Sequence, residues 1–139
     1  MIKFLGKKLY MKIYSLVPRL TVDLVVKDSN GILLVKRDME PCKGKWHFPG
    51  GTIVLGEKIE DAIKRVARNE AGIKVGIQKF LGVYEYSKKG AFGQCIALVH
   101  LVKPISKSKR GNVRIFNKLP GNMISDQRKI LEKFVWKKN

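Results

Sequence analysis

Two mainly apolar runs separated by a polar turn sequence lie in the first third of the chain. Residues 20–27 (LTVDLVVK) and 32–36 (ILLVK) are β-branched apolar runs, and the turn-forming sequence Asp28-Ser29-Asn30-Gly31 joins them. Because two such runs joined by a short turn pair with each other, they predict a β-hairpin. Residues 46–48 (WHF) predict a further extended segment that Pro49-Gly50-Gly51 ends.

The second half of the chain repeats this pattern and ends in a helix. Residues 78–87 and 94–102 are long strand candidates, joined through residues 88–93, and they predict a second hairpin. Residues 112–117 predict a short strand. Ser125 is a residue type that caps helices, and it precedes a final helix whose inward-facing residues would be Ile130, Leu131, Phe134 and Val135.

Between the two hairpins, residues 58–71 follow a helical pattern that Gly56 and Glu57 open and Gly72 closes. Helical residues advance by about 100° each, which places Glu70 in the middle of an apolar arc formed by Ile59, Ile63, Val66 and Ala67. An unpaired buried carboxylate is costly, so Glu70 requires a partner, a cation or a shifted pKa.

These elements predict an α/β fold made mostly of strands, with one early and one late helix. Hairpins without repeated crossovers favour a mixed β-sheet with helices on its faces. Residues 19–139 would form this domain, since a chain of 139 residues suffices for one core. Residues 1–18 are a basic N-terminal segment whose pattern suits a short helix or a strand.

Positive charge is the unusual feature of the composition. The chain has 29 Lys and Arg against 11 Asp and Glu, a net charge of +18, which favours phosphate-bearing ligands, nucleic acid or anionic membrane surfaces. No uncharged apolar run reaches the roughly 18 residues of a membrane span, and no membrane partner is expected. Cys42 and Cys95 lack metal-ligand spacing, which indicates reduced thiols and a cytoplasmic protein.

The predicted early helix and its lead-in carry glycine, glutamate and arginine at fixed intervals: Gly51, Glu57, Arg65, Glu70 and Gly72. This spacing resembles the Nudix box, G-x5-E-x7-R-E-U-x-E-E-x-G-U, where U is a bulky aliphatic residue. Lys36-Arg37, Trp46 and residues 48–51 (FPGG) extend the resemblance, which covers residues 19–102. It implies a Nudix-type α/β/α sandwich, with a mixed sheet between the box helix and a C-terminal helix, that hydrolyses a nucleoside diphosphate linked to another group.

The Nudix family uses Mg²⁺ or Mn²⁺ held by glutamates of this helix, since hard cations prefer oxygen ligands and neutralise a diphosphate. The resemblance implies Mg²⁺, with Mn²⁺ as the second candidate. Its ligands would be Glu70, the backbone carbonyl of Gly50 and the amide oxygen of Asn69. Glu57 and Arg65 would support the catalytic site, and Arg37 would face the substrate phosphates.

Two glutamates of the box are replaced here, by Val66 and Asn69, so one cation is expected in place of several. GDP-mannose mannosyl hydrolases lack the same two glutamates, and the chain resembles them over residues 20–37. This resemblance makes a GDP-sugar the leading substrate. In those enzymes the base is a histidine from a late loop, whereas residues 103–118 contain no histidine.

The general base is therefore open among Glu85, His47 and His100. The alternative function is a nucleotide- or RNA-binding Nudix-like domain with weak or no catalysis, which the missing base and the positive charge favour. The expected partner is a small nucleotide substrate. RNA is a further candidate through the basic surface, and the sequence leaves a homodimer open.

Overall fold

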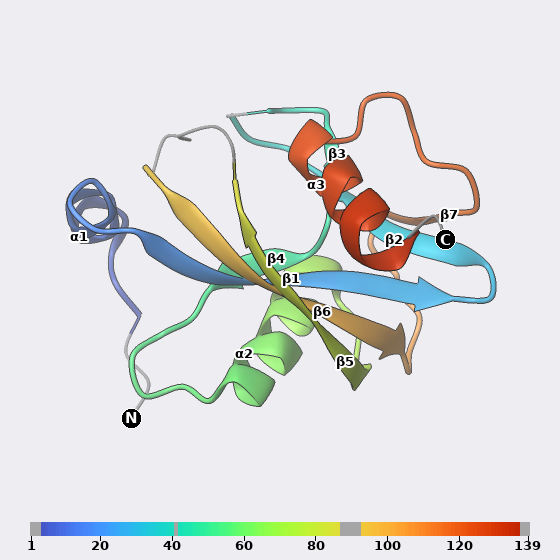
Figure 1. The fold of residues 1–139 in the computed structure, drawn as a ribbon, viewed down its shortest axis with the longest axis horizontal. Helices are drawn as coiled ribbons and strands as arrows, with labels where there is room; N and C mark the ends of the chain where they lie inside the picture. The colour runs from blue at the N-terminus through green and yellow to red at the C-terminus, as the bar shows by residue number, and fades with distance from the viewer. Residues whose placement is uncertain (1–3, 41, 87–92, 137–139) are drawn as a thin grey trace.

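The computed structural model describes residues 4–40, 42–86 and 93–136, and a seven-stranded sheet forms its centre (Figure 1). Its strands are β1 (Arg19–Asp28), β2 (Gly31–Lys36), β3 (Trp46–His47), β4 (Gly50–Thr52), β5 (Val75–Glu85), β6 (Cys95–Pro104) and β7 (Val113–Phe116). Across the sheet the order is β3-β2-β1-β6-β5, with β4 paired to β1 and β7 paired to β2. The helices are α1 (Lys7–Tyr14), α2 (Ile59–Val66) and α3 (Ser125–Ile130), and α2 and α3 continue into the π-helical turns η1 (Ala67–Ala71) and η2 (Leu131–Val135).

Both predicted hairpins are confirmed. β1 pairs antiparallel with β2, and β5 pairs antiparallel with β6. The two hairpins meet at the centre, where β1 and β6 run parallel along eight residue pairs from Arg19↔Cys95 to Val26↔Val102. The sheet is therefore mixed, as predicted. Residues 88–92 of the predicted connection between β5 and β6 lie outside the described residues.

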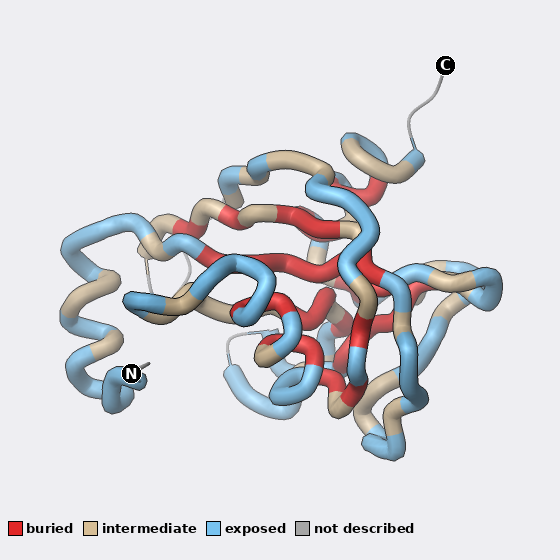
Figure 2. The backbone as a smooth tube through the Cα atoms, turned by 90° about the horizontal axis from the view of Figure 1, so that it is seen from below, coloured by how far each residue is buried: buried red, intermediate tan, exposed pale blue. Residues whose placement is uncertain are grey.

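Strand β1 is the centre of the core because a helix covers each face of the sheet around it. Its residues 21–26 are all buried. On one face α2 packs Ile63 and Val66 into one apolar cluster. On the other face Ile130 and Leu131 pack with Phe48 in a second cluster. Figure 2 shows these buried segments running through the middle of the molecule, and the predicted α/β/α sandwich is confirmed.

The Pro-Gly-Gly sequence before α2 does not end the extended chain, contrary to expectation. Gly50 and Gly51 belong to β4, which pairs with β1 in the register Asp23↔Gly50 and Val22↔Gly51. A Cβ atom on Gly50 would lie 2.9 Å from Oδ1 of Asp23, and one on Gly51 would lie 3.1 Å from Cγ2 of Val66. Glycine thus allows the backbone of β4 to lie this close to β1 and α2.

The two helices of the sandwich begin and end differently from the prediction. The predicted helix over residues 58–71 is an α-helix only as far as Val66, and η1 completes it. Gly72 closes it as expected, in the left-handed conformation with φ of 66°. Ser125 is the first helical residue of α3 and not its cap, because the chain enters the helix through Ile124, whose N–H donates to the Trp46 carbonyl over 3.0 Å.

The N-terminal segment contains α1, which lies beside one end of the sheet (Figure 1). The hydroxyl oxygens of Tyr10 and Thr52 lie 2.5 Å apart and connect α1 to β4. β1 begins at Arg19, and the division of the chain into residues 1–18 and 19–139 stays a prediction.

Within the described chain, no helix has both the length and the apolar character that crossing a membrane requires.

The packing of α2 on the sheet can be tested by two isoleucines of the same helix. Ile63 is 1% exposed, whereas Ile59 is 45% exposed. We expect Ile63→Ala to lower the free energy of unfolding by about 2–5 kcal/mol, because it removes buried apolar contacts and leaves a cavity. Ile59→Ala should cost less than about 1 kcal/mol. Urea unfolding measures both, and equal losses would contradict this packing.

Candidate active site

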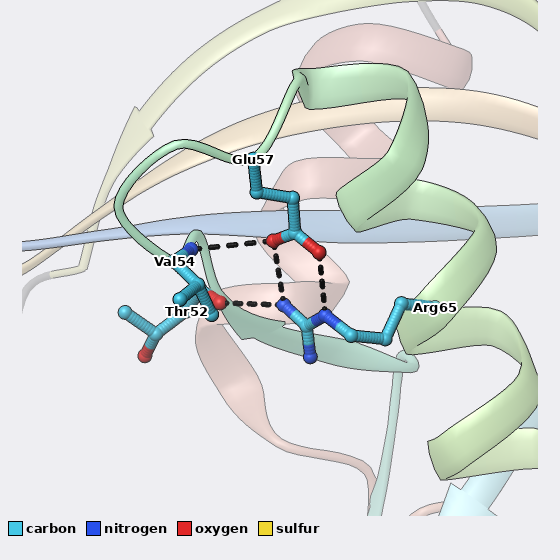
Figure 3. Close-up of polar contacts among 4 residues, drawn as sticks. All are labelled: Thr52, Val54, Glu57 and Arg65. Carbon is cyan, nitrogen blue, oxygen red and sulfur yellow. Dashed lines mark hydrogen bonds and ion pairs between the residues drawn. The ribbon is translucent and has the colours of Figure 1, made fainter. Parts of the chain in front are cut away.

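A partly buried ion pair connects the chain before α2 with the last turn of that helix and with β4. Arg65 donates to Glu57 twice, from Nε to Oε2 over 2.7 Å and from Nη2 to Oε1 over 3.0 Å, and Nη2 also donates to the Thr52 carbonyl over 2.8 Å (Figure 3). Oε1 of Glu57 accepts the Val54 N–H over 3.2 Å as well. The Glu57 side chain is 1% exposed, and the hydrogen bonds from Arg65 hold the pKa of its carboxyl below the usual value. The pair therefore sets the position of the whole box helix relative to the sheet.

A cleft of about 310 Å³ opens where β1, β4, η1 and the first residues of α3 meet. Charged side chains of both signs line this cleft, together with the backbone of Gly50 and Gly51; they are Arg19, Arg37, Lys45, Asp23, Glu70 and Asp126. Convergent polar groups in a cavity of this size are typical of a small-molecule site. Glu57 and Arg65 are not among the lining residues, so they position the site from outside the cleft.

Glu70 lies in η1 at the edge of the cleft, and more than a third of it is exposed. The expected position in the middle of the apolar arc is therefore wrong. Within this π-helical turn Ala67 and Ala71 are buried, whereas Glu70 is exposed and lines the cleft. The surrounding protein atoms raise the pKa of Glu70, and the positive charge of Arg37 acts in the opposite direction.

Asn69 does not line the cleft, although the sequence made it a candidate ligand. It is exposed, and its backbone carbonyl accepts a hydrogen bond from Nη1 of Arg110 over 2.6 Å. Nη2 of Arg110 also donates to the Arg68 carbonyl over 3.2 Å. The guanidinium of Arg110 thus satisfies the last carbonyls of the box helix, where positive charge is favourable.

The floor of the cleft is a hydrogen-bonded network that the sequence analysis did not identify. Asp23 is 4% exposed and accepts hydrogen bonds from the hydroxyls of Tyr86 and Thr21. Burial raises the pKa of Asp23, and these two hydrogen bonds oppose the shift. Gln127 donates to the Tyr86 hydroxyl over 3.1 Å and accepts the N–H of Phe48. The signal for this network was present in the sequence, since Thr21 and Asp23 interrupt an otherwise apolar strand.

His47 also lines the cleft, and its ring has a defined orientation. Nδ1 lies 2.6 Å from the Phe48 carbonyl oxygen. A carbonyl oxygen can only accept, so Nδ1 carries the hydrogen and Nε2 keeps its lone pair in the neutral ring. Burial lowers the pKa of His47, which favours this neutral form.

The other predicted residues lie in different places. Arg37 is half-buried and lines the cleft. Glu85 is exposed on β5, and its carboxylate accepts a hydrogen bond from Gln94 over 2.9 Å. His100 lies on β6 with its ring 5.1 Å from that of Phe80. Glu85 and His100 do not line the cleft, so their geometry gives no support to a role as general base.

The oxygen donors of the cleft fit one particular kind of metal binding. Among the described residues, no group of three or more His, Cys, Asp or Glu side chains could hold a metal ion. The cleft offers the exposed carboxylate of Glu70 and the backbone of Gly50, while Asp23 already accepts hydrogen bonds from Tyr86 and Thr21, and Asp126 accepts one from Tyr84. Mg²⁺ keeps several waters and binds through one or two carboxylates together with substrate phosphates. The donor set fits such a hydrated cation better than a closed cage of protein ligands.

Comparison with known proteins gives one consistent family. The model of the NUDIX domain matches residues 17–125. An ADP-ribose pyrophosphatase from Methanocaldococcus jannaschii is 31% identical over 141 residues, covering 94% of this chain and 83% of that protein. The low-salt glycan biosynthesis protein Agl8 from Haloferax volcanii is 44% identical over 70 residues, covering half of this chain and 45% of the relative's length. The crystal structure of a MutT NUDIX hydrolase from Burkholderia pseudomallei has a TM-score of 0.74 at 26% identity, covering 84% of this chain and 98% of that one.

The role of the Glu57–Arg65 pair can be tested through its pH dependence. Glu57→Gln should lower the free energy of unfolding at about pH 7 by about 1.5–3 kcal/mol, because it removes charged hydrogen bonds. A depressed folded pKa means that the stabilisation is present above the ordinary value of 4.5 and is lost as the pH falls through the lower folded value. Wild type and variant should therefore converge in acid.

The measurement is urea unfolding of wild type and variant from about pH 7 down to pH values below the ordinary pKa of 4.5. Glu60→Gln is the matched control. Glu60 is exposed in the first turn of α2, and its substitution should change little. A gap between wild type and Glu57→Gln that did not narrow in acid would show that the ion pair is not its cause.

Proposed function

This chain belongs to the NUDIX domain family, and on that premise we propose that it hydrolyses a nucleoside diphosphate linked to a sugar. The observation that carries the proposal is the cleft, in which Glu70 of the box helix lies together with three basic side chains, Arg19, Arg37 and Lys45. Arginine and lysine are the side chains that bind phosphate oxygens, and a diphosphate brings enough negative charge to engage several of them. A carboxylate among these cations provides a place for a divalent metal.

The chain's own residues divide into a binding group and a positioning group. Glu70 and the Gly50 carbonyl are the metal ligands, and Arg37 binds the diphosphate. A divalent cation held there would neutralise phosphate charge and orient the attacking water. Glu57 and Arg65 act from outside the cleft by keeping the box helix in register with β4. Mg²⁺ is the proposed metal and Mn²⁺ the second candidate.

His47 is the proposed general base. Its Nδ1 is occupied by the Phe48 carbonyl, which leaves Nε2 as a proton acceptor in a ring that lines the cleft. A base must be neutral to accept a proton, and burial lowers the pKa of His47. Asp23 is less suited, since hydrogen bonds from Tyr86 and Thr21 already occupy its carboxyl oxygens.

GDP-sugars are the leading substrates, on account of the two missing box glutamates and the similarity to mannosyl hydrolases over residues 20–37. ADP-ribose is the second candidate, because a relative that aligns over 94% of this chain is named an ADP-ribose pyrophosphatase. A panel of GDP-mannose, GDP-glucose, ADP-ribose, UDP-glucose and a dinucleotide, each with Mg²⁺, distinguishes the two. Phosphate, sugar and nucleotide products show which bond breaks. Tight binding without turnover of any compound would favour the alternative of a nucleotide-binding domain without catalysis.

Two glutamates allow the metal site to be tested with a matched control. Glu70→Gln should lower kcat/KM for the best substrate by at least about 100-fold, which corresponds to about 2.7 kcal/mol of transition-state stabilisation. It should also weaken Mg²⁺ binding in isothermal titration. Glu85→Gln, on the exposed side of β5, should leave both quantities within about twofold. Equal effects of the two substitutions would refute the assignment of Glu70.

The base is tested by a pH profile. In the wild type, activity should fall as the pH drops through a pKa below 6.5, because protonated His47 cannot accept a proton. His47→Gln should lower kcat by about 100-fold or more with little change in KM, and should remove this acidic limb. His100→Gln is the control and should keep the limb. An unchanged limb in His47→Gln would assign the base to another group.

A further inference from the structure

One end of the molecule carries an apolar surface that the core does not use. It consists of Phe4, Leu5, Leu9, Leu16, Val17, Leu20 and Leu55, which we call the N-terminal patch. Their exposed fractions run from 38% for Leu5 to 77% for Leu16 and 93% for Leu55. Contiguous exposed apolar residues of this kind mark interaction sites, whereas single ones need no explanation.

Contacts between the segments place the patch residues at the same end of the molecule. The Ile53 N–H donates to the Leu20 carbonyl over 3.0 Å, which joins the loop that carries Leu55 to the start of β1. The guanidinium of Arg65, which donates to Glu57 of the same loop, lies 5.3 Å from the ring of Phe4. Figure 1 shows α1, the chain before it and the loop between β4 and α2 at the same end of the sheet.

Helix α1 is connected to the body through Tyr10, and apolar residues within the helix and next to it stay exposed. Tyr10 contacts Thr52 and accepts a hydrogen bond from Arg19 over 3.2 Å. In the described chain no residue of α1 is buried, and neither apolar cluster includes one. Leu9 in α1 is 50% exposed, and Leu5 and Leu16, in the chain just before and just after the helix, are exposed as well, so none of them contributes to the core.

The charges beside these leucines have one sign. Within α1, Lys8 and Lys12 lie next to Leu9 at helical spacing, and Lys7 precedes them. The sequence contains no Asp or Glu before Asp23. In the loop that carries Leu55, the carboxylate of Glu57 is neutralised by Arg65. The patch is therefore an apolar surface bordered by lysines.

We propose that the N-terminal patch docks on an anionic lipid surface, with the leucines entering the headgroup region and the lysines pairing with lipid phosphates. An amphipathic helix with lysines beside its apolar face is the usual element for lying in a membrane interface. A second copy of the chain fits less well, because each copy carries a net charge of +18 and the patch itself is basic. An RNA would engage the lysines but not the leucines. This inference does not depend on the proposed function, and it replaces the expectation of no membrane partner, which rested on the lack of a spanning segment.

The experiment is vesicle co-sedimentation of the full chain at near-physiological salt. Vesicles of phosphatidylcholine alone are compared with vesicles containing about 30% phosphatidylserine. We expect binding at least about tenfold tighter to the anionic vesicles. Leu9→Ser/Leu16→Ser and, separately, Lys7→Gln/Lys8→Gln/Lys12→Gln should each reduce it by about tenfold or more.

Matched controls remove the same groups elsewhere. Val83→Ser/Ile105→Ser changes two side chains that are 52% and 68% exposed, and Lys107→Gln/Lys109→Gln/Lys129→Gln removes the same charge. Both control variants should bind the anionic vesicles with an affinity within about twofold of the wild-type affinity. Thermal unfolding verifies that every variant is folded.

Three results would overturn the proposal. The first is equal binding to neutral and anionic vesicles, or losses in the controls as large as in the patch variants. The second is a leucine variant that still binds vesicles while the lysine variant does not, which indicates a polyanion site such as one for RNA. The third is a dimer in sedimentation equilibrium that the leucine variant dissociates, which assigns the patch to a second copy.

Discussion

The ion pair between Glu57 and Arg65 is the interaction on which the geometry of the site depends. Arg65 holds the carboxylate of Glu57 and the Thr52 carbonyl with one guanidinium, so the box helix, the loop before it and β4 are fixed as one unit. β4 carries the Gly50 backbone, and η1 carries Glu70 at the other end of the same helix. A solvent-exposed ion pair would contribute little to the free energy of unfolding. The Glu57 side chain is only 1% exposed, so removing its partner Arg65 would leave a buried charge and destabilise the fold substantially. The pair thus acts on the cleft without lining it.

The box helix changes from α to π before Glu70, and this residue lies differently from the sequence expectation. In a continuous α-helix Glu70 would lie within the apolar arc, where burial would favour its neutral form. In the structure it lies instead, within a π-helical turn, at the edge of a cleft lined by basic side chains, while Ala67 and Ala71 are buried in the core. Single π-helical turns are common at functional sites because they shift one residue out of the regular register. Arg110 then stabilises the widened helix end through the Asn69 and Arg68 carbonyls.

Positive charge is used in distinct ways across the molecule. Arg65 and Arg110 have structural roles, at a carboxylate and at helix carbonyls. Arg37 and Lys45 line the cleft, where a phosphate-bearing ligand would neutralise them. The lysines of α1 border an apolar surface instead, outside the cleft. The net charge of +18 does not distinguish structural, cleft-lining and surface side chains, because it counts every lysine and arginine equally.

The sequence by itself determined the strands, the two hairpins, the box spacing and the closing glycine, because each depends on local periodicity or turn chemistry. Residues 20–27 form a strand because of their own apolar and β-branched pattern. Gly72 adopts the left-handed conformation because it directly follows the helix and has no Cβ atom. Only the tertiary structure decided which side chains share the cleft. Asp23, Tyr86 and Gln127 come from three distant segments, and their hydrogen bonds exist only once β1, β5 and α3 are packed together. The same holds for Glu70 and Asn69, neighbours in sequence of which only Glu70 lines the cleft. Local pattern fixes the elements, whereas the chemistry of the site depends on contacts between residues that the chain brings together from far apart.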